Sequence, residues 1–167
     1  MHLRQPAVAG RFYTDVPADL RAEVESFLKQ GATLPASALA AGDAAHLAGL
    51  MLPHAGHVYS GRVIGATLAH VRLPRTVFLL CPNHTGLGTP LSVWPAGAWQ
   101  TPLGPVPVDG EMARLLCEAD EDFSADVMGH VREHSIEVLL PFLQVCAGDA
   151  PLHVVPVCVG TGQAPVL

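Results

Sequence analysis

The stretch TVFLLCPNHTG, residues 76–86, carries the pattern that decides the fold. Its first six residues, 76–81, are apolar enough for a strand that is buried on both faces of a sheet. Pro82 ends that strand because proline has no N–H to donate to a neighbouring strand, and His84 follows two residues later. The same order of apolar run, proline, histidine and glycine occurs at residues 47–56, LAGLMLPHAG. The sequence therefore predicts buried strands at 47–52 and 76–81, each delivering a histidine at its carboxyl end.

Helices are expected around these strands, because apolar residues recur at helical spacing behind capping residues. The predicted helices cover residues 17–30, 60–71, 109–116 and 135–145, the further strands cover 92–94 and 154–159, and a loop covers 33–43. Pro17 suits the first position of the first helix, with Asp15 as its cap and Gly31 as its stop. Ser60 and Asp109 would cap the second and third helices.

The alternation of short apolar strands and helices predicts an α/β fold. We expect one domain over residues 1–167, with three α/β/α layers and a largely parallel sheet, because no repeat or linker divides the chain. Ligands bind outside the carboxyl ends of the strands in such folds. His54 and His84 would both reach that edge. Pro141 would kink or restart the last helix.

Composition excludes several classes of function. Half of the 167 residues are apolar and 14% are charged, which argues against disorder. The net charge is −6 and no basic block occurs, so we expect no nucleic-acid partner. No apolar stretch approaches the roughly 20 residues of a membrane span. The N-terminus has no signal-peptide pattern and the four cysteines form no CxxC pair, which together predict a cytoplasmic protein with reduced thiols.

Nine histidines in a chain with so few other charges indicate a metal site. His54 and His84 are the expected ligands, because a neutral imidazole on a rigid strand end can bind a metal. His57 lies three residues after His54 and either binds substrate or satisfies local backbone groups. Asn83 either binds substrate or forms an Asx-turn.

His134 opens the predicted fourth helix, where the helix dipole disfavours a cation. A neutral ring there suits a ligand or a general base, and we expect His134 and Glu133 to be catalytic. Glu133 or Glu137 could orient the ring, while Glu137 could equally complete an N-terminal cap. Cys81 is either a metal ligand or a small hydrophobic residue. His130 stays undecided.

Imidazole ligands suit zinc, iron and copper alike, so these residues do not identify the metal. No phosphate-binding loop of the GxGxxG or GxxxxGK[ST] type occurs. The G-x-S-x-G motif of serine hydrolases is also absent. Spacing alone thus predicts a histidine-rich site for a transition metal at a sheet edge.

Six ordered motifs resemble one known family. They are PAVAGRFY (6–13), PHAG (53–56) with SG (60–61), PNHTG (82–86), TPLG (101–104) with Asp109, EHSIE (133–137) with LPFL (140–143), and VPV (155–157) with Gly160. This set resembles the Memo family, whose bacterial members are called AmmeMemoRadiSam system protein B. The resemblance covers nearly the whole chain.

The resemblance implies a fold similar to class III extradiol dioxygenases, which hold a non-haem iron with histidines and a carboxylate. It implies that His54 and His84 are metal ligands. It also places His134 where those enzymes have a catalytic base. The family is linked to iron or copper redox chemistry, to signalling interactions, and in bacteria to radical-SAM and AMMECR1-type proteins. It implies no particular substrate, whether a small molecule or a peptide.

The sequence departs from the family pattern in two ways. Cys81 stands where the family commonly has glycine. Family members also continue well past residues 155–157 and add a segment whose cysteine completes the metal site. We therefore expect this chain to hold the larger N-terminal part of the family domain. We expect its metal site to be incomplete on its own.

Three functions stay open at this point. The first is iron or copper redox chemistry of the dioxygenase kind. The second is a module that binds a small molecule or peptide in the same pocket without turnover. The third is hydrolysis assisted by zinc, which activates water. A homo-oligomer is compatible with each of them.

Overall fold

The computed structural model describes residues 2–33 and 48–160. Its elements in chain order are β1 (Leu3–Arg4), α1 (Pro17–Ala32), α2 (His57–Leu68), β2 (Thr76–Pro82), β3 (Leu91–Val93), β4 (Ala98–Thr101), β5 (Gly104–Pro107), α3 (Gly110–Ala119), β6 (Phe123–Ala125), the 3-10 helix η2 (Glu137–Leu139), α4 (Leu140–Ala147) and β7 (His153–Val159). No helix among the described residues is both long and apolar enough to cross a membrane.

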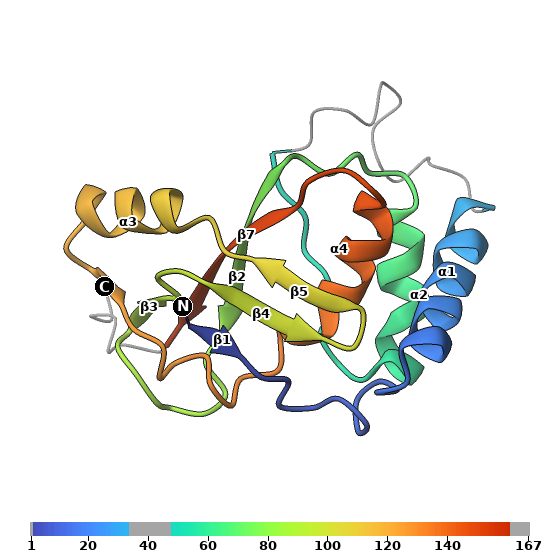
Figure 1. Cartoon of the computed structure of the whole chain (residues 1–167), viewed down its shortest axis with the longest axis horizontal. Helices are drawn as coiled ribbons and strands as arrows, with labels where there is room; N and C mark the ends of the chain where they lie inside the picture. The colour runs from blue at the N-terminus through green and yellow to red at the C-terminus, as the bar shows by residue number, and fades with distance from the viewer. Residues whose placement is uncertain (1, 34–47, 161–167) are drawn as a thin grey trace, which may run out of the picture.

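Two mixed sheets form the centre of the molecule (Figure 1). The larger has the order β2-β7-β3-β6, with β2 parallel to β7, β3 parallel to β6, and β3 antiparallel to β7. The smaller has the order β1-β4-β5, and its β4–β5 pair is an antiparallel hairpin. The predicted α/β class is confirmed, with antiparallel pairings inside each sheet. Within the described residues β2 is an edge strand.

Helices pack on both faces of β7, as the three-layer prediction requires. Val154 and Cys158 of β7 belong to the main core that includes side chains from α1, α2 and α4. Val155 and Val157 point the other way and pack with Ala113 of α3. Figure 1 shows α3 on the opposite side of β7 from the other helices. Alternation along one buried strand thus builds both layers.

The contact between α1 and α2 corrects two expectations for the first helix. Pro17 begins α1 as predicted, but the N-cap is Val16 and Asp15 gives no side-chain cap. Gly31 lies inside the helix rather than ending it. A Cβ at Gly31 would overlap the backbone of Gly65 in α2, so glycine is needed for close helix packing and not for a stop.

The second predicted helix begins earlier than expected. Gly56 is the N-cap of α2, and Ser60 lies one turn inside, where its hydroxyl donates to the carbonyl oxygen of Ala55 at 2.8 Å. The other two helix starts follow the sequence. Asp109 caps α3 by accepting from the N–H of Met112, and Pro141 restarts the chain as α4 after η2.

One predicted strand is wrong. Residues 48–52 form no strand, and Leu47 lies outside the described residues. Most of the predicted loop at 33–43 also lies outside them. The apolar run at 48–52 faces the same groove as the edge strand β2, yet no described strand pairs with it. A strand needs a partner for its backbone groups, and residues 48–52 are paired with no strand in the described part of the chain, although β2 has a free edge.

Candidate metal centre

Three histidines from distant parts of the sequence meet at one point. His54 precedes α2, His84 follows β2, and His134 precedes η2. Each offers a ring nitrogen, and these donor atoms all lie within 4.8 Å of one another. The ring centroids are 4.8 Å apart for His84 and His134, and 5.2 Å apart for His54 and His84. The structure therefore brings together the two predicted ligands and the predicted base.

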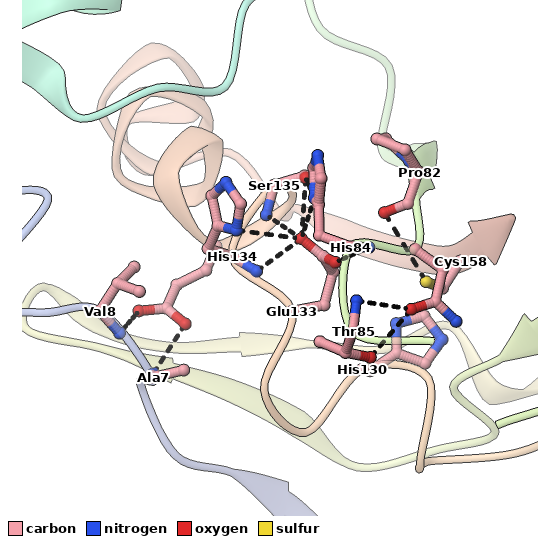
Figure 2. Close-up of polar contacts among 12 residues, drawn as sticks. Ala7, Val8, Pro82, His84, Thr85, His130, Glu133, His134, Ser135 and Cys158 are labelled. Carbon is pink, nitrogen blue, oxygen red and sulfur yellow. Dashed lines mark hydrogen bonds and ion pairs between the residues drawn. The ribbon is translucent and has the colours of Figure 1, made fainter. Parts of the chain in front are cut away.

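Glu133 lies buried behind these rings and holds two of them (Figure 2). Its carboxylate accepts from the His84 N–H at 2.7 Å and lies 3.0 Å from His84 Nδ1. It lies 3.2 Å from His134 Nδ1 and also accepts from the His134 N–H. The Ser135 N–H and hydroxyl complete this set of donors. Glu133 thus fixes the rings and does not reach the open side of the cluster.

The charge state of the cluster suits a cation. Burial would raise the pKa of Glu133, but hydrogen bonds from His84 and Ser135 outweigh it and lower the pKa to about 2. Burial lowers the pKa of His134, and together with the neighbouring His84 and His54 it outweighs the opposing effect of Glu133. Near neutral pH the site therefore holds a carboxylate and a neutral His134 ring.

The side chain of Asn83 shapes the loop that carries His84. Its Oδ1 accepts from the N–H of Thr85 at 3.0 Å and of Gly86 at 2.9 Å, and its Nδ2 donates to the Leu87 carbonyl. This is the Asx-turn alternative of the sequence analysis. The oxygen and the nitrogen of the Asn83 side chain therefore both bond within the loop, which places Asn83 to position His84. Its expected contact with substrate stays a prediction.

His57 is not brought to the cluster, which corrects its assignment as a substrate-binding residue. It is buried, with Nδ1 3.0 Å from Glu23 and Nε2 2.9 Å from the carbonyl oxygen of Val138. Its ring stacks on Tyr13 with centroids 5.2 Å apart. As the first residue of α2 it points into the core, whereas His54 lies before the helix and faces the groove.

A buried polar network ties the N-terminal segment to the site, and the sequence reasoning missed it. Glu137 accepts from Arg4 at 2.7 Å, from the Tyr13 hydroxyl at 2.8 Å, and from the N–H groups of Ala7 and Val8. Neither expected role of Glu137, as a cap or as the partner of a histidine, is seen. The sequence did hold one signal for this network. Glu137 lies in the apolar stripe of a predicted helix, and a carboxylate buried there needs polar partners.

This network also places an aromatic side chain against the cluster. Phe12 contacts His134 edge-to-face, with ring centroids 5.0 Å apart. The carbonyl oxygen of Phe12 accepts from the His57 N–H at 2.8 Å, which fixes the segment at the start of α2. The motif at residues 6–13 therefore supports the histidine cluster from one side.

Cys81 and His130 are buried side chains whose contacts lie outside the histidine cluster. Cys81 is buried opposite Cys158 in the β2–β7 pairing, and a hydrogen bond with Cys158 together with burial raises the pKa of the Cys81 thiol. His130 is buried between Trp94 and Trp99, and its Nε2 lies 2.9 Å from the carbonyl oxygen of Ser92. Neither side chain belongs to the group of metal-binding candidates found among the described residues.

The cluster opens onto an apolar groove of about 1710 Å³. His54 and His134 line it together with the 48–53 segment, α2 and β2. Carboxylates are absent from its described lining, and its charged members apart from histidine are Arg11 and Arg72. An ion held by the three rings would therefore face an apolar space in which a ligand could bind.

The donor set fits a transition metal. Glu133 faces Nδ1 of His84 and of His134, which leaves Nε2 of each ring free to bind. A carboxylate behind a ligating histidine fixes its tautomer and orientation, as metal sites generally require. Three imidazoles suit iron, copper or zinc. The prediction that a further ligand comes from outside this chain stays a prediction.

Comparison with known proteins tests the family resemblance independently of the geometry of the site. The sequence model of the family described as Memo-like protein matches residues 4–166. The chain is 41% identical over 165 residues to a MEMO1 family protein of Desulfurococcus amylolyticus, covering 96% of this chain and 58% of the relative. It is 40% identical over 163 residues to one of Thermotoga neapolitana, covering 93% and 57%.

A MEMO1 family protein of Methanopyrus kandleri is 42% identical over 165 residues, covering 93% of this chain and 56% of the relative. The chain thus spans a little more than half the length of these curated relatives. The match covers almost all of this chain, including the three histidines and Glu133. The chain therefore belongs to the Memo-like protein family.

Proposed function

We propose that His54, His84 and His134 hold one transition-metal ion, iron or copper, for redox chemistry of the kind carried out by extradiol dioxygenases. The observation that carries this proposal is the convergence of three ring nitrogens within 4.8 Å at the mouth of an apolar groove. When bound, such an ion would exchange electrons with a substrate or with dioxygen.

The residues around the ion would each have a separate task. Glu133 keeps Nδ1 of His84 and His134 occupied, so that both rings present Nε2 to the open side. Asn83 holds the loop of His84, and Phe12 packs against His134. The lowered pKa of His134 keeps that ring unprotonated, so its Nε2 can bind the ion.

The groove supports an apolar or aromatic substrate. Its described lining is mostly aliphatic, with Arg11 and Arg72 as its non-histidine charges. The proposed substrate is an apolar small molecule or peptide with a group that reaches His54 and His134. We also propose cytoplasmic action, because all four cysteines are free thiols. A functional association with radical-SAM and AMMECR1-type proteins stays a prediction.

Oxygen uptake tests the proposed chemistry. Protein purified without a metal-chelating tag is loaded anaerobically with ferrous iron or cuprous copper and then mixed with oxygenated buffer and a reductant. We expect catalytic oxygen uptake above that of the free metal with at least one of the two metals, and its loss in His54→Ala and His84→Ala. Uptake equal to that of the free metal for both, or activity with zinc in ester hydrolysis instead, would overturn the redox proposal.

A further inference from the structure

Two of the four cysteines face each other across the pair of strands β2 and β7. In the parallel ladder that joins these strands, Cys81 is the direct Cα partner of Cys158. Both side chains belong to the same core cluster, so they lie on one face of the sheet, and a hydrogen bond joins the two thiols. Neither thiol belongs to the metal-binding group among the described residues. The pair is therefore a second chemical feature of this sheet, separate from the histidine cluster.

The spacing of the two residues suits a disulfide bond. Neighbouring strands lie roughly 4.7–4.9 Å apart, and disulfides join residues whose Cα atoms are roughly 4.4–6.8 Å apart. Direct partners on one face of a sheet meet this condition, and two thiols that share a hydrogen bond need only a small approach to form the bond. The other two cysteines, Cys117 and Cys146, lie on separate helices and in separate core clusters.

A small oxidant can reach one sulfur of the pair. Cys158 is completely buried, whereas Cys81 lines the groove onto which the histidine cluster opens. Cys81 is only 4% exposed, and its hydrogen bond with Cys158 and its burial raise the pKa of its thiol. A protonated and enclosed thiol reacts slowly, so the site favours a small hydroperoxide over a bulky disulfide such as oxidised glutathione. We therefore expect the pair to stay reduced until peroxide accumulates.

The pair lies at the base of the loop that carries His84. Directly after it, the N–H of Asn83 donates to the carbonyl oxygen of Val159 at 2.9 Å. The Cys158 thiol itself donates to the carbonyl oxygen of Pro82 at 3.9 Å (Figure 2). A covalent link between the strands at this point would hold the start of the His84 loop against β7.

We propose that Cys81 and Cys158 form a reversible intramolecular disulfide when the protein meets a hydroperoxide, and that this bond tightens the His84 loop against β7. In the first step the Cys81 sulfur attacks the peroxide and the O–O bond breaks. Cys81 becomes a sulfenic acid, and its proton goes to the oxygen that leaves as water or an alcohol. In the second step the Cys158 sulfur displaces the hydroxyl of the sulfenic acid, which leaves as water with the Cys158 proton. The two thiols lose two electrons, the hydroperoxide gains them, and a dithiol reductant reverses the reaction.

Hydrogen peroxide is the probe, added to the reduced 167-residue protein in an excess of chelator so that no metal takes part. We expect the mass of the protein to fall by two hydrogen atoms, and peptide mapping to join Cys81 and Cys158 in one fragment. Hydrogen exchange at residues 82–86 should slow by about threefold or more, because the bond restricts local opening of the loop. Dithiothreitol should reverse both changes.

Cys117→Ala is the matched control, because Cys117 lies on α3 in the other core cluster and its variant should form the bond like the parent. Cys81→Ala and Cys158→Ala should each lose the bond, and either one suffices if the other does not fold. A parent protein that keeps four free thiols would overturn the proposal, as would a fragment joined through Cys117 or Cys146 instead. A disulfide that leaves exchange at residues 82–86 unchanged would overturn the effect on the loop.

This inference is separate from the proposed metal chemistry, because its test is run without metal. His54→Ala removes a proposed ligand but leaves both sulfurs in place, so it should oxidise like the parent. Normal disulfide formation in a protein that binds no metal would contradict only the proposed function. Metal binding in a protein that forms no disulfide would contradict only the role of the cysteine pair.

Discussion

At the residue scale, the centre depends on one buried carboxylate as much as on its three histidines. Glu133 joins residues of two loops, because its oxygens meet His84 on one side and His134 and Ser135 on the other. The histidines were predictable, since each stands next to a strand end or helix start. The donors to Glu133 were not, because loop contacts across 49 residues leave no local pattern.

Glu133→Gln tests this positioning role. The variant keeps the size of the side chain but loses its charge and one acceptor, so His84 and His134 are less well oriented. We expect metal affinity to fall by about 10- to 100-fold, the usual effect of removing such a partner. Isothermal titration measures it, with the exposed Glu118→Gln as control. Equal affinities in the two variants would show that Glu133 does not position the ligands.

His130 gives the protein a defined pH dependence of stability. Burial lowers its pKa to about 4, so the unfolded chain binds more protons than the folded chain between about pH 4 and 6.5. The contribution of His130 to stability is therefore complete above pH 6.5 and is lost as the pH falls. Between pH 7 and pH 5 the free energy of unfolding should drop by about 2 kcal/mol through this residue.

Urea unfolding at the two pH values measures the drop for His130. We expect a smaller difference in His130→Asn than in the parent. His2→Asn changes an exposed histidine and should keep the full difference. A parent-like drop in His130→Asn would assign the effect to other groups.

At the element scale, the sequence predicted strands and helices correctly where apolar periodicity was strong. The predictions failed where contacts with a distant part of the chain determine the structure. β2 and β7 were predicted from continuous apolar runs, and α3 from its Asp109 cap. The expected burial of β2 on both faces was wrong, because Phe78 and Leu80 are exposed in the described structure. The hairpin β4–β5 was missed because it contains Pro105 and Pro107, which argue against a strand away from a sheet edge. Gly31 looked like a helix stop because local sequence cannot show that α2 packs against it.

The close packing of α1 on α2 predicts how much stability is lost when one methyl group is added at Gly65. Alanine normally stabilises a helix by about 1 kcal/mol over glycine. At Gly65 the new Cβ would instead meet Phe27 of α1 at contact distances that require the helices to separate. We expect Gly65→Ala to lower the free energy of unfolding by about 1–3 kcal/mol.

Chemical denaturation measures this change in helix packing. Gly49→Ala is the control, because no atom of the described residues lies within 4 Å of its Cβ position. It should leave the stability close to that of the parent. A stabilised Gly65→Ala variant would mean that the two helices do not approach as closely as described.

At the scale of the whole molecule, the chain combines a well-packed core with one open side. Trp99, Phe142 and Leu20 are completely buried, and apolar side chains pack on both faces of β7. The groove between α2 and β2 remains open in the described residues and leads to the histidines. The sequence predicted the covered sheet but also a strand at 47–52. The prediction failed because residues 48–52 pair with no described strand, and the local apolar pattern does not show whether a partner strand lies beside a segment.

The most direct test of the central claim is metal stoichiometry measured by titration and mass spectrometry. Tag-free protein is titrated with ferrous iron or cuprous copper under anaerobic conditions. We predict one ion per chain for at least one of these metals. Loss of that ion is expected in each of His54→Ala, His84→Ala and His134→Ala, with His57→Ala keeping it if the variant stays folded. An unchanged stoichiometry in all three cluster variants would contradict the account.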